Sequence, residues 1–188
     1  MNGPDERPLH VTAAGLDDCA ALARINVESW QVAYASLFSA EYLASLSIAD
    51  REASWRGIVA SSASRTLVAR HGGEVRGYIT CGPCRDQGAA PTRGEVWALY
   101  VAPQAWSSGA GWALWEAARV RLLHLGCADV SLWVLSGNAR GIAFYQSLGF
   151  VQEPGSEQRF ERGGTTLAEV KLVFARLSAT PAVERLRR

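Results

Sequence analysis

The chain has 188 residues, of which 48% are hydrophobic and 20% charged, enough for one domain with a full core. Its 19 Lys and Arg nearly balance its 18 Asp and Glu, so no broad basic surface indicates nucleic acid or an anionic membrane as a partner. No apolar run approaches the roughly 20 residues that cross a bilayer, and the N-terminus lacks a basic region followed by an apolar segment. These features predict a cytoplasmic protein.

The first half of the chain is expected to form a strand, a helical region and two further strands. Leu16 is followed by two aspartates, which favour a helix start because they complement the positive end of the helix dipole. The glycines of His71-Gly72-Gly73 can adopt positive φ and predict a turn between two strands. We expect strands over 9–13, 65–70 and 74–80, a helix from residue 16, helices over 39–46 and 50–60, and a loop over 82–94.

The second half contains two strand–helix units in succession. Val96 to Ala102 is apolar and β-favouring, Pro103 ends it, and the segment 107–111 opens a helix. A second strand, Val130 to Leu135, precedes a helix that begins near Asn138, a good N-cap residue.

A hairpin over 157–161 and 167–174, joined by two glycines, is expected to end the domain. The order of elements predicts an α/β fold with a mixed, partly antiparallel sheet. We divide the chain into a flexible N-terminus (1–8), one domain (9–177) and a flexible basic tail (178–188).

The segment Ser107-Ser108-Gly109-Ala110-Gly111 has the composition of an anion site. Backbone N–H groups at a helix start have no intrahelical partner, so these donors and the macrodipole favour a phosphate. Glycines let the phosphate approach the backbone closely. Such a turn can also serve only for tight packing, so taken alone it leaves both interpretations open.

Motifs between Glu95 and Phe150 resemble those of a known family. In chain order they are L-Y-V-x-P, S-S-G-x-G, L-W-V, N-x-R and F-Y-x-x-x-G-F. This order is similar to that of the GCN5-related N-acetyltransferase (GNAT) superfamily, whose members transfer acetyl from acetyl-CoA to an amine. The resemblance implies a single domain with a mixed, mostly antiparallel sheet of about seven strands flanked by helices. Trp106 departs from the family, which usually has Gln or Arg there to contact the pyrophosphate.

The resemblance implies where acetyl-CoA binds. Backbone groups of Leu99, Tyr100 and Val101 would pair with pantetheine in the manner of an added strand. Asn138 would hold the pantetheine through its amide, cap the following helix, or do both. For the pyrophosphate at the helix start, we expect contacts from Trp106, Ser107, Ser108, Gly109, Ala110, Gly111 and Trp112.

Acetyl transfer requires a neutral amine and a proton for the departing thiolate. Glu95 is the candidate base, and the alternative is a glutamate in solvent at the edge of a strand. Tyr145 is the candidate acid, since family members point this hydroxyl at the CoA sulfur; the alternative is an aromatic core residue. Trp30 and Tyr34 are expected to line the site of a small amine acceptor, unless they form a core-facing helix stripe.

Of the four cysteines, only Cys81 and Cys84 have suggestive spacing, and the three histidines are scattered along the chain. We therefore predict no metal. The Cys81 and Cys84 thiols are interpreted as residues of a strand end, with a thioredoxin-like redox role as the alternative.

Two other classes of function compete with a small-molecule acetyltransferase. One is an acyl-CoA-binding or sensing module without catalysis, and the other is a nucleotide-binding protein that uses the same turn. The turn has neither the Gly-Lys-Ser/Thr ending of a P-loop nor the first glycine of the dinucleotide fingerprint. Within the family, a protein N-terminus is an alternative acceptor, and dimers are common, so the choice between a monomer and a homodimer stays open.

Overall fold

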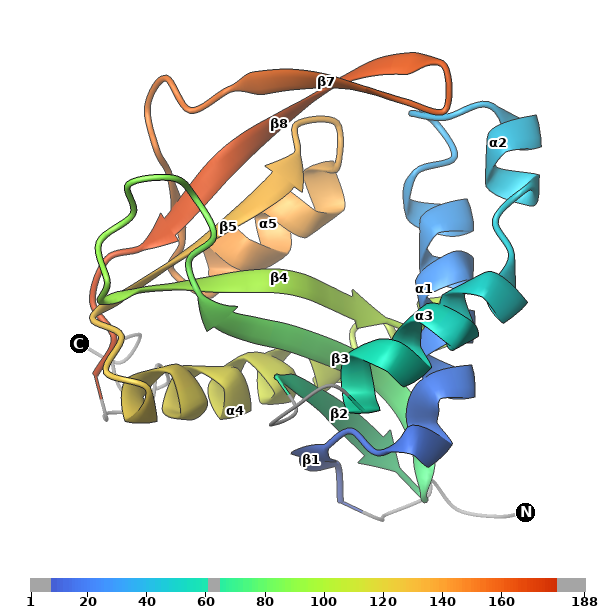
Figure 1. Cartoon of the computed structure of the whole chain (residues 1–188), viewed down its shortest axis with the longest axis horizontal. Coiled ribbons are helices and arrows are strands. Elements are labelled where there is room, and N and C mark those ends of the chain that lie inside the picture. Colours follow the sequence, from blue (N-terminus) through green and yellow to red (C-terminus); the bar gives the residue numbers. More distant parts are fainter. Residues whose placement is uncertain (1–7, 61–64, 179–188) are drawn as a thin grey trace.

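The computed structural model describes residues 8–60 and 65–178. Its core is an eight-stranded sheet in the order β1-β2-β3-β4-β5-β8-β6, with β7 paired to β8 (Figure 1). The strands are β1 (His10–Ala13), β2 (Thr66–His71), β3 (Glu74–Pro83), β4 (Arg93–Val101), β5 (Asp129–Leu135), β6 (Val151–Gln152), β7 (Gln158–Arg162) and β8 (Thr165–Phe174). Apart from Pro8 and Ser178, the predicted N-terminal segment and tail lie outside the described residues.

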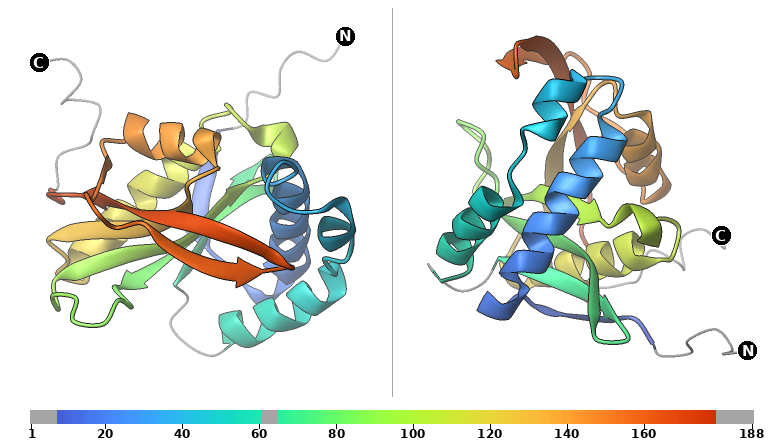
Figure 2. Two further views of the ribbon diagram at one scale, coloured as in Figure 1. Left: turned by 90° about the horizontal axis from the view of Figure 1, so that it is seen from above. Right: turned by 90° about the vertical axis from the view of Figure 1, so that its right-hand side faces the viewer.

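The helices cover both faces of this sheet. Figure 2 shows α1, α2 and α3 on one side and α4 and α5 on the other. The helices are α1 (Cys19–Ala33), α2 (Ala40–Ala44), α3 (Ile48–Ala60), α4 (Ala110–His124) and α5 (Ala139–Ser147), with 3-10 turns at Leu16–Asp18 and Pro103–Ala105. Among the described residues, every strand pair is antiparallel except β4 with β5, which confirms the mixed, mostly antiparallel sheet.

Some element boundaries differ from the sequence prediction. The predicted loop over 82–94 is shorter, because Gly82 pairs with Glu95 and Pro83 pairs with Gly94 to extend β3 and β4. Pro83 has no N–H to donate, and the next residue continues the pairing, with the Cys84 N–H donating to the Arg93 carbonyl at 2.9 Å. β6 was not predicted, since two exposed residues carry no periodic pattern.

Alternate residues of the central strands build two separate cores. Leu67 on β2 belongs to the core under α4, whereas its neighbour Val68 belongs to the core under α1 and α3. Ile79 and Tyr78 on β3 divide in the same way. This alternation follows from the two-residue period of a strand, and it fixes helices firmly on both faces.

The sheet splits between β4 and β5. The two strands pair in parallel only where 93–95 lie opposite 129–131, and then diverge (Figure 1). Beyond Glu95, the edge of β4 that faces β5 has no strand partner among the described residues. The divergence leaves room for a cleft inside the sheet.

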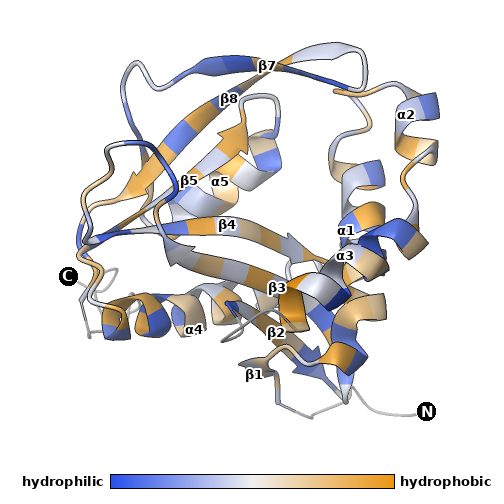
Figure 3. Ribbon diagram, in the orientation of Figure 1, coloured by the Kyte–Doolittle hydropathy of each residue, from blue (hydrophilic) through white to orange (hydrophobic). Residues whose placement is uncertain are grey.

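A third core joins the β7–β8 hairpin to the helices across this split. It contains Trp30, Tyr34, Phe38 and Leu43 from the helical side and Leu167 from β8. β7 is otherwise mostly hydrophilic, with the sequence QRFER, as Figure 3 shows. The hairpin therefore attaches to α1 and α2 at one end. Within the described residues, no helix is long and apolar enough to cross a membrane.

Candidate active site

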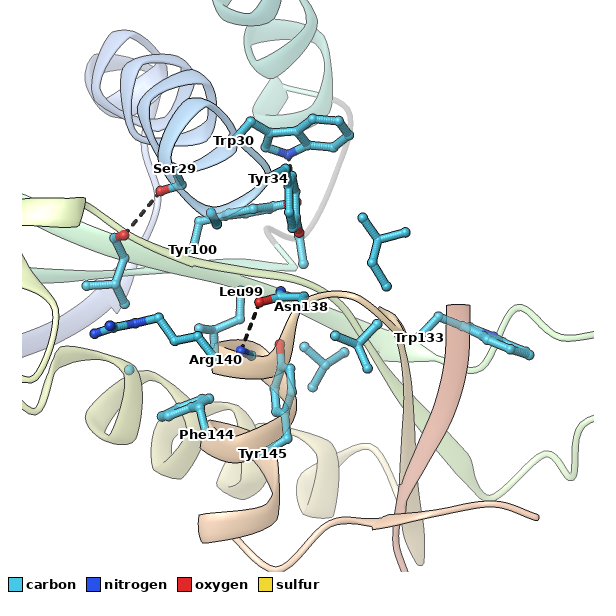
Figure 4. Close-up of a pocket in the computed structure, with 18 of the residues that line it drawn as sticks. Ser29, Trp30, Tyr34, Leu99, Tyr100, Trp133, Asn138, Arg140, Phe144 and Tyr145 are labelled. Atoms are coloured by element: carbon cyan, nitrogen blue, oxygen red, sulfur yellow. Dashed lines mark hydrogen bonds between the residues drawn. The ribbon is translucent and has the colours of Figure 1, made fainter. Parts of the chain in front are cut away.

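A cavity of about 810 Å³ opens where β4 and β5 diverge (Figure 4). Its walls come from α1, β4, the turn before α4, β5, α5 and the β7–β8 hairpin. This volume falls in the range typical of small-molecule and cofactor sites. The cavity brings together most of the residues that the sequence singled out: Trp30, Tyr34, Glu95, Leu99, Tyr100, Val101, Trp106, Ser107, Gly109, Gly111, Trp112, Asn138 and Tyr145.

Two of the predicted cofactor contacts lie outside this lining. Ala110 is 1% exposed and packs in the core under α4, so its side chain faces away from the cavity. Ser108 is exposed, and its hydroxyl accepts a hydrogen bond from the Ala110 N–H at 3.4 Å. Their side chains therefore have local structural roles.

The turn before α4 presents free backbone donors to the cavity. The N–H groups of Gly109, Gly111 and Trp112 donate to no acceptor among the described residues. Gly109 has φ 86°, in the left-handed region that glycine adopts without penalty, and an added Cβ there would meet nothing within 4 Å. Such open, unpaired donors at a helix start suit a phosphate group.

Ser107 adopts the left-handed conformation as well, with φ 63°. For a residue with a Cβ this region is strained, at a cost of order 1–3 kcal/mol. The strained residue lies where the backbone changes direction between Trp106 and α4.

Trp106 turns its hydrogen-bonding group away from the turn. Its indole Nε1 donates to the Val101 carbonyl at 2.8 Å, and its ring lies under the Arg140 guanidinium, 4.1 Å from ring centroid to Cζ. The Val101 carbonyl also accepts a hydrogen bond from Ser29 Oγ at 3.1 Å. Trp106 is therefore a packing surface for Arg140 and a brace for the end of β4.

Asn138 caps α5, as the sequence predicted. Its Oδ1 accepts a hydrogen bond from the Gly141 N–H at 2.9 Å (Figure 4). Its amide also interacts with the Tyr34 hydroxyl, which links α5 to α1 across the cavity. The predicted contact of Asn138 with pantetheine stays a prediction.

Glu95 stands at the apex of the split, opposite Ser131 on β5. It is 2% exposed, so the alternative of a solvent-exposed strand-edge residue is wrong. Its carboxylate is held by Arg85, which donates from its backbone N–H at 2.8 Å and from Nη2 at 2.5 Å. Arg85 was not predicted from the sequence, because only the return of the loop onto β4 makes this contact.

Tyr145 points into the cavity below Asn138 (Figure 4). Burial, and secondarily the neighbouring Tyr100, raises the pKa of its hydroxyl, which therefore keeps its proton at neutral pH. Its ring packs edge-on against Phe144 and Phe150, so the core-packing alternative describes part of its role. A protonated hydroxyl in a cavity is available as a hydrogen-bond donor or an acid.

Trp30 and Tyr34 line the cavity and belong to the third core at the same time. They are 7% and 8% exposed, and their rings pack edge-on at 5.0 Å. Trp30 Nε1 donates to the Tyr100 hydroxyl at 2.9 Å. Burial, and then the Tyr100 hydroxyl, raises the pKa of Tyr34. The two rings thus line the cavity and form a core-facing stripe at once, and their contact with an acceptor stays a prediction.

Three arginines line the cavity, and none was predicted from the sequence: Arg85, Arg140 and Arg162. Each lies over a tryptophan that also lines it, Arg85 over Trp97 at 5.0 Å and Arg162 over Trp30 at 5.4 Å. In the sequence, Arg140 was marked only as the last residue of the N-x-R motif, and the tryptophan count of seven does not tell which rings meet a cation.

The cysteines do not form a common site. Cys81 lies inside β3 and is fully buried, and Cys84 follows the strand with its Sγ 3.6 Å from Ser131 Oγ. The described cysteines are all free thiols. In the part of the chain that the structure describes, no group of three or more His, Cys, Asp or Glu could hold a metal ion.

The sheet splits between β4 and β5, and free backbone donors at the start of α4 lie beside this split. The model of the acetyltransferase (GNAT) family matches residues 23–150. The chain belongs to this family. It is therefore an acetyltransferase, as its motifs predicted.

Individual GNAT proteins agree with this assignment. The uncharacterized N-acetyltransferase YuaI of Bacillus subtilis is 32% identical over 170 residues, which cover 90% of this chain and 94% of YuaI. The structure resembles PaiA N-acetyltransferase from Thermoplasma acidophilum in complex with coenzyme A, with a TM-score of 0.66 at 21% identity, covering 86% of this chain and 98% of PaiA. It also resembles YncA from Salmonella typhimurium with acetyl-CoA, with a TM-score of 0.67 at 21% identity, covering 92% and 95%. The two solved structures share the fold of this chain.

Proposed function

We propose that this GNAT protein transfers acetyl from acetyl-CoA directly to the amine of a small molecule. One juxtaposition carries the proposal. Free backbone donors at the start of α4 and the Glu95 carboxylate at the apex of the β4–β5 split face one cavity. The first suits the phosphates of the donor, and the second suits a protonated amine.

The free edge of β4 connects these two ends. Leu99, Tyr100 and Val101 pair with β3 on one side and have no described strand on the other, so an extended pantetheine chain could add there. In this arrangement the thioester lies near Tyr145, whose protonated hydroxyl would supply a proton to the thiolate. Acetyl-CoA, when bound, supplies the activated acyl group, and the protein positions the amine and moves the protons.

The acceptor end of the cavity favours a small molecule over a folded protein surface. The β7–β8 hairpin crosses this end and attaches to α2, where Gly163 lies so close to the Tyr42 ring that an added Cβ would stand 2.5 Å from it. A bridged opening admits small amines and thin extended chains, so a protein N-terminus is the runner-up acceptor. The cytoplasmic location and the homodimeric assembly stay predictions from the sequence.

The direct experiment is a screen of amines for free CoA release from acetyl-CoA, with mass measurement of each product. Acetylation of one class of small amine would support the proposal. Acetylation of peptide N-termini alone would replace the small acceptor by a protein. Acetyl-CoA binding without release to any amine would favour the acyl-CoA-binding module.

A further inference from the structure

We propose that Arg140 binds the pyrophosphate of CoA and replaces the side-chain contact that residue 106 makes in most GNAT proteins. This inference rests on the proposed function, because it assigns part of the donor site. It starts from Trp106, which has no charge and has its indole N–H engaged by Val101 at 2.8 Å. The turn therefore receives no side-chain donor from that position.

Arg140 lies where such a donor is needed. It is the second residue of α5, exposed, and lines the cavity together with Ser107, Gly109 and Gly111 of the turn. In Figure 4 its side chain extends along the cleft between Leu99 and Phe144. α4 and α5 meet at this point, since a Cβ on Gly111 would come within 3.0 Å of the Phe144 ring. The guanidinium and the free N–H groups of the turn thus border the same part of the cavity.

The charge of Arg140 is not neutralised by the described part of the protein. No carboxylate within residues 8–60 and 65–178 forms an ion pair with it. The other two arginines of the cavity are placed elsewhere: Arg85 is bound to Glu95, and Arg162 lies over Trp30 at the acceptor end. Arg140 is therefore the cavity's cation on the side of the turn.

Trp106 gives this arginine a defined position. A flat guanidinium stacked on an indole ring keeps its N–H donors free at its edge, where they can form paired hydrogen bonds to phosphate oxygens. Stacking also restricts the rotamers of a long side chain before the ligand arrives, which lowers the entropy lost on binding. An apolar residue at position 106 thus supports the cation instead of replacing it.

The test compares donors that differ in their phosphates. Arg140→Ala should weaken acetyl-CoA binding by about tenfold or more, the scale of a hydrogen bond to a charged group. Acetyl-dephospho-CoA, which keeps the pyrophosphate, should show the same loss, and S-acetylpantetheine, which has no phosphate, should show none. The salt dependence of the acetyl-CoA Kd should also become weaker, because a partly exposed charge pair is screened.

Three variants serve as controls. Arg159→Ala removes an exposed arginine of β7 that pairs with Glu157 and lies outside the cavity lining, so it should leave the Kd unchanged. Arg140→Gln keeps most of the side-chain stem and should show the same loss of affinity. It replaces Arg140→Ala as the test variant if the alanine variant is poorly folded. Adding Trp106→Arg to Arg140→Ala should recover part of the affinity by restoring a family-type contact.

An unchanged acetyl-CoA Kd in folded Arg140→Ala and Arg140→Gln would overturn the inference. An equal loss for S-acetylpantetheine would do so too, and a loss confined to acetyl-CoA would move the contact to the 3′-phosphate. These outcomes differ from a failure of the proposed function, in which the parent protein itself binds no acetyl-CoA and the inference falls with it.

Discussion

The Glu95 carboxylate, buried at the apex of the β4–β5 split, is bound by the Arg85 guanidinium at 2.5 Å. Arg85 is 61% exposed, so its head group sits in the mouth of the cavity and can move into solvent. A base for the acceptor must be reached by the amine, which would occupy the position of this guanidinium. The Arg85 guanidinium and the acceptor amine therefore compete for the Glu95 carboxylate.

The first prediction concerns Glu95 itself. Glu95→Gln should lower kcat by about a hundredfold at pH 7, because the bound amine loses the group that takes its proton. The deficit should shrink at pH 9.5, where more of an alkyl amine is already neutral. Steady-state rates at both values test this, with acetyl-CoA Kd as the control for folding. A parental rate at pH 7 would remove Glu95 from the mechanism.

The second prediction concerns its partner. Arg85→Ala should lower the KM of the acceptor severalfold, because the amine no longer displaces a bound cation from Glu95. The Kd of acetyl-CoA should stay the same. Arg65→Ala is a matched control, since Arg65 also lies over Trp97, at 5.1 Å, but has no contact with Glu95. A higher acceptor KM in Arg85→Ala would show that Arg85 binds the acceptor.

The third prediction separates the acid from the base. Burial raises the pKa of Tyr145 above its ordinary value near 10, so this hydroxyl keeps its proton at both pH 7 and pH 9.5. Tyr145→Phe should therefore reduce kcat by a similar factor at the two values, on the order of ten- to a thousandfold. Its ring contacts with Phe144 and Phe150 would remain. Near-parental turnover would leave Tyr145 with packing alone.

The fourth prediction addresses the acceptor wall. Phenylalanine is the better replacement at Trp30 and at Tyr34, because it keeps an aromatic ring in the third core; Trp30→Phe still removes the indole N–H that donates to the Tyr100 hydroxyl. Both variants should raise the acceptor KM severalfold with acetyl-CoA Kd within about twofold. Equal weakening of both substrates would indicate that the rings act by packing α1 against the hairpin.

The fifth prediction is a loss of stability in alkali. Burial raises the pKa of the Cys81 thiol from 9.0 to about 11. Between these values the unfolded chain loses this proton and the folded chain keeps it, so stability falls as pH rises through the window. The Cys81 contribution at pH 10.5 is about 2 kcal/mol. Urea unfolding at pH 8 and 10.5 should show a smaller pH-dependent loss in Cys81→Ala than in the parent; an equal loss would exclude Cys81 as a source.

Features of the fold that depend on residues close together in the chain could be predicted from the sequence. The N-cap at Asn138 and the helix start after Gly109 depend on residues three or four positions apart, so the sequence alone predicted them. The strands with clear alternation followed in the same way, and the motif order indicated the family. β6 was not predicted, because two exposed residues are too few to show a periodic hydrophobic pattern.

By itself, the sequence determined most of the elements, the glycine turn and the membership of the acetyltransferase family. Only the tertiary structure decided that Arg85 binds Glu95, that Arg140 stacks on Trp106 and that Trp30 and Tyr34 are at once wall and core. These contacts join segments that the fold brings together from different loops and helices. Their geometry depends on how β4 and β5 diverge and on which side chains face the space between them. Hydrophobic periodicity predicts the type of an element and its buried face, but it does not predict these contacts.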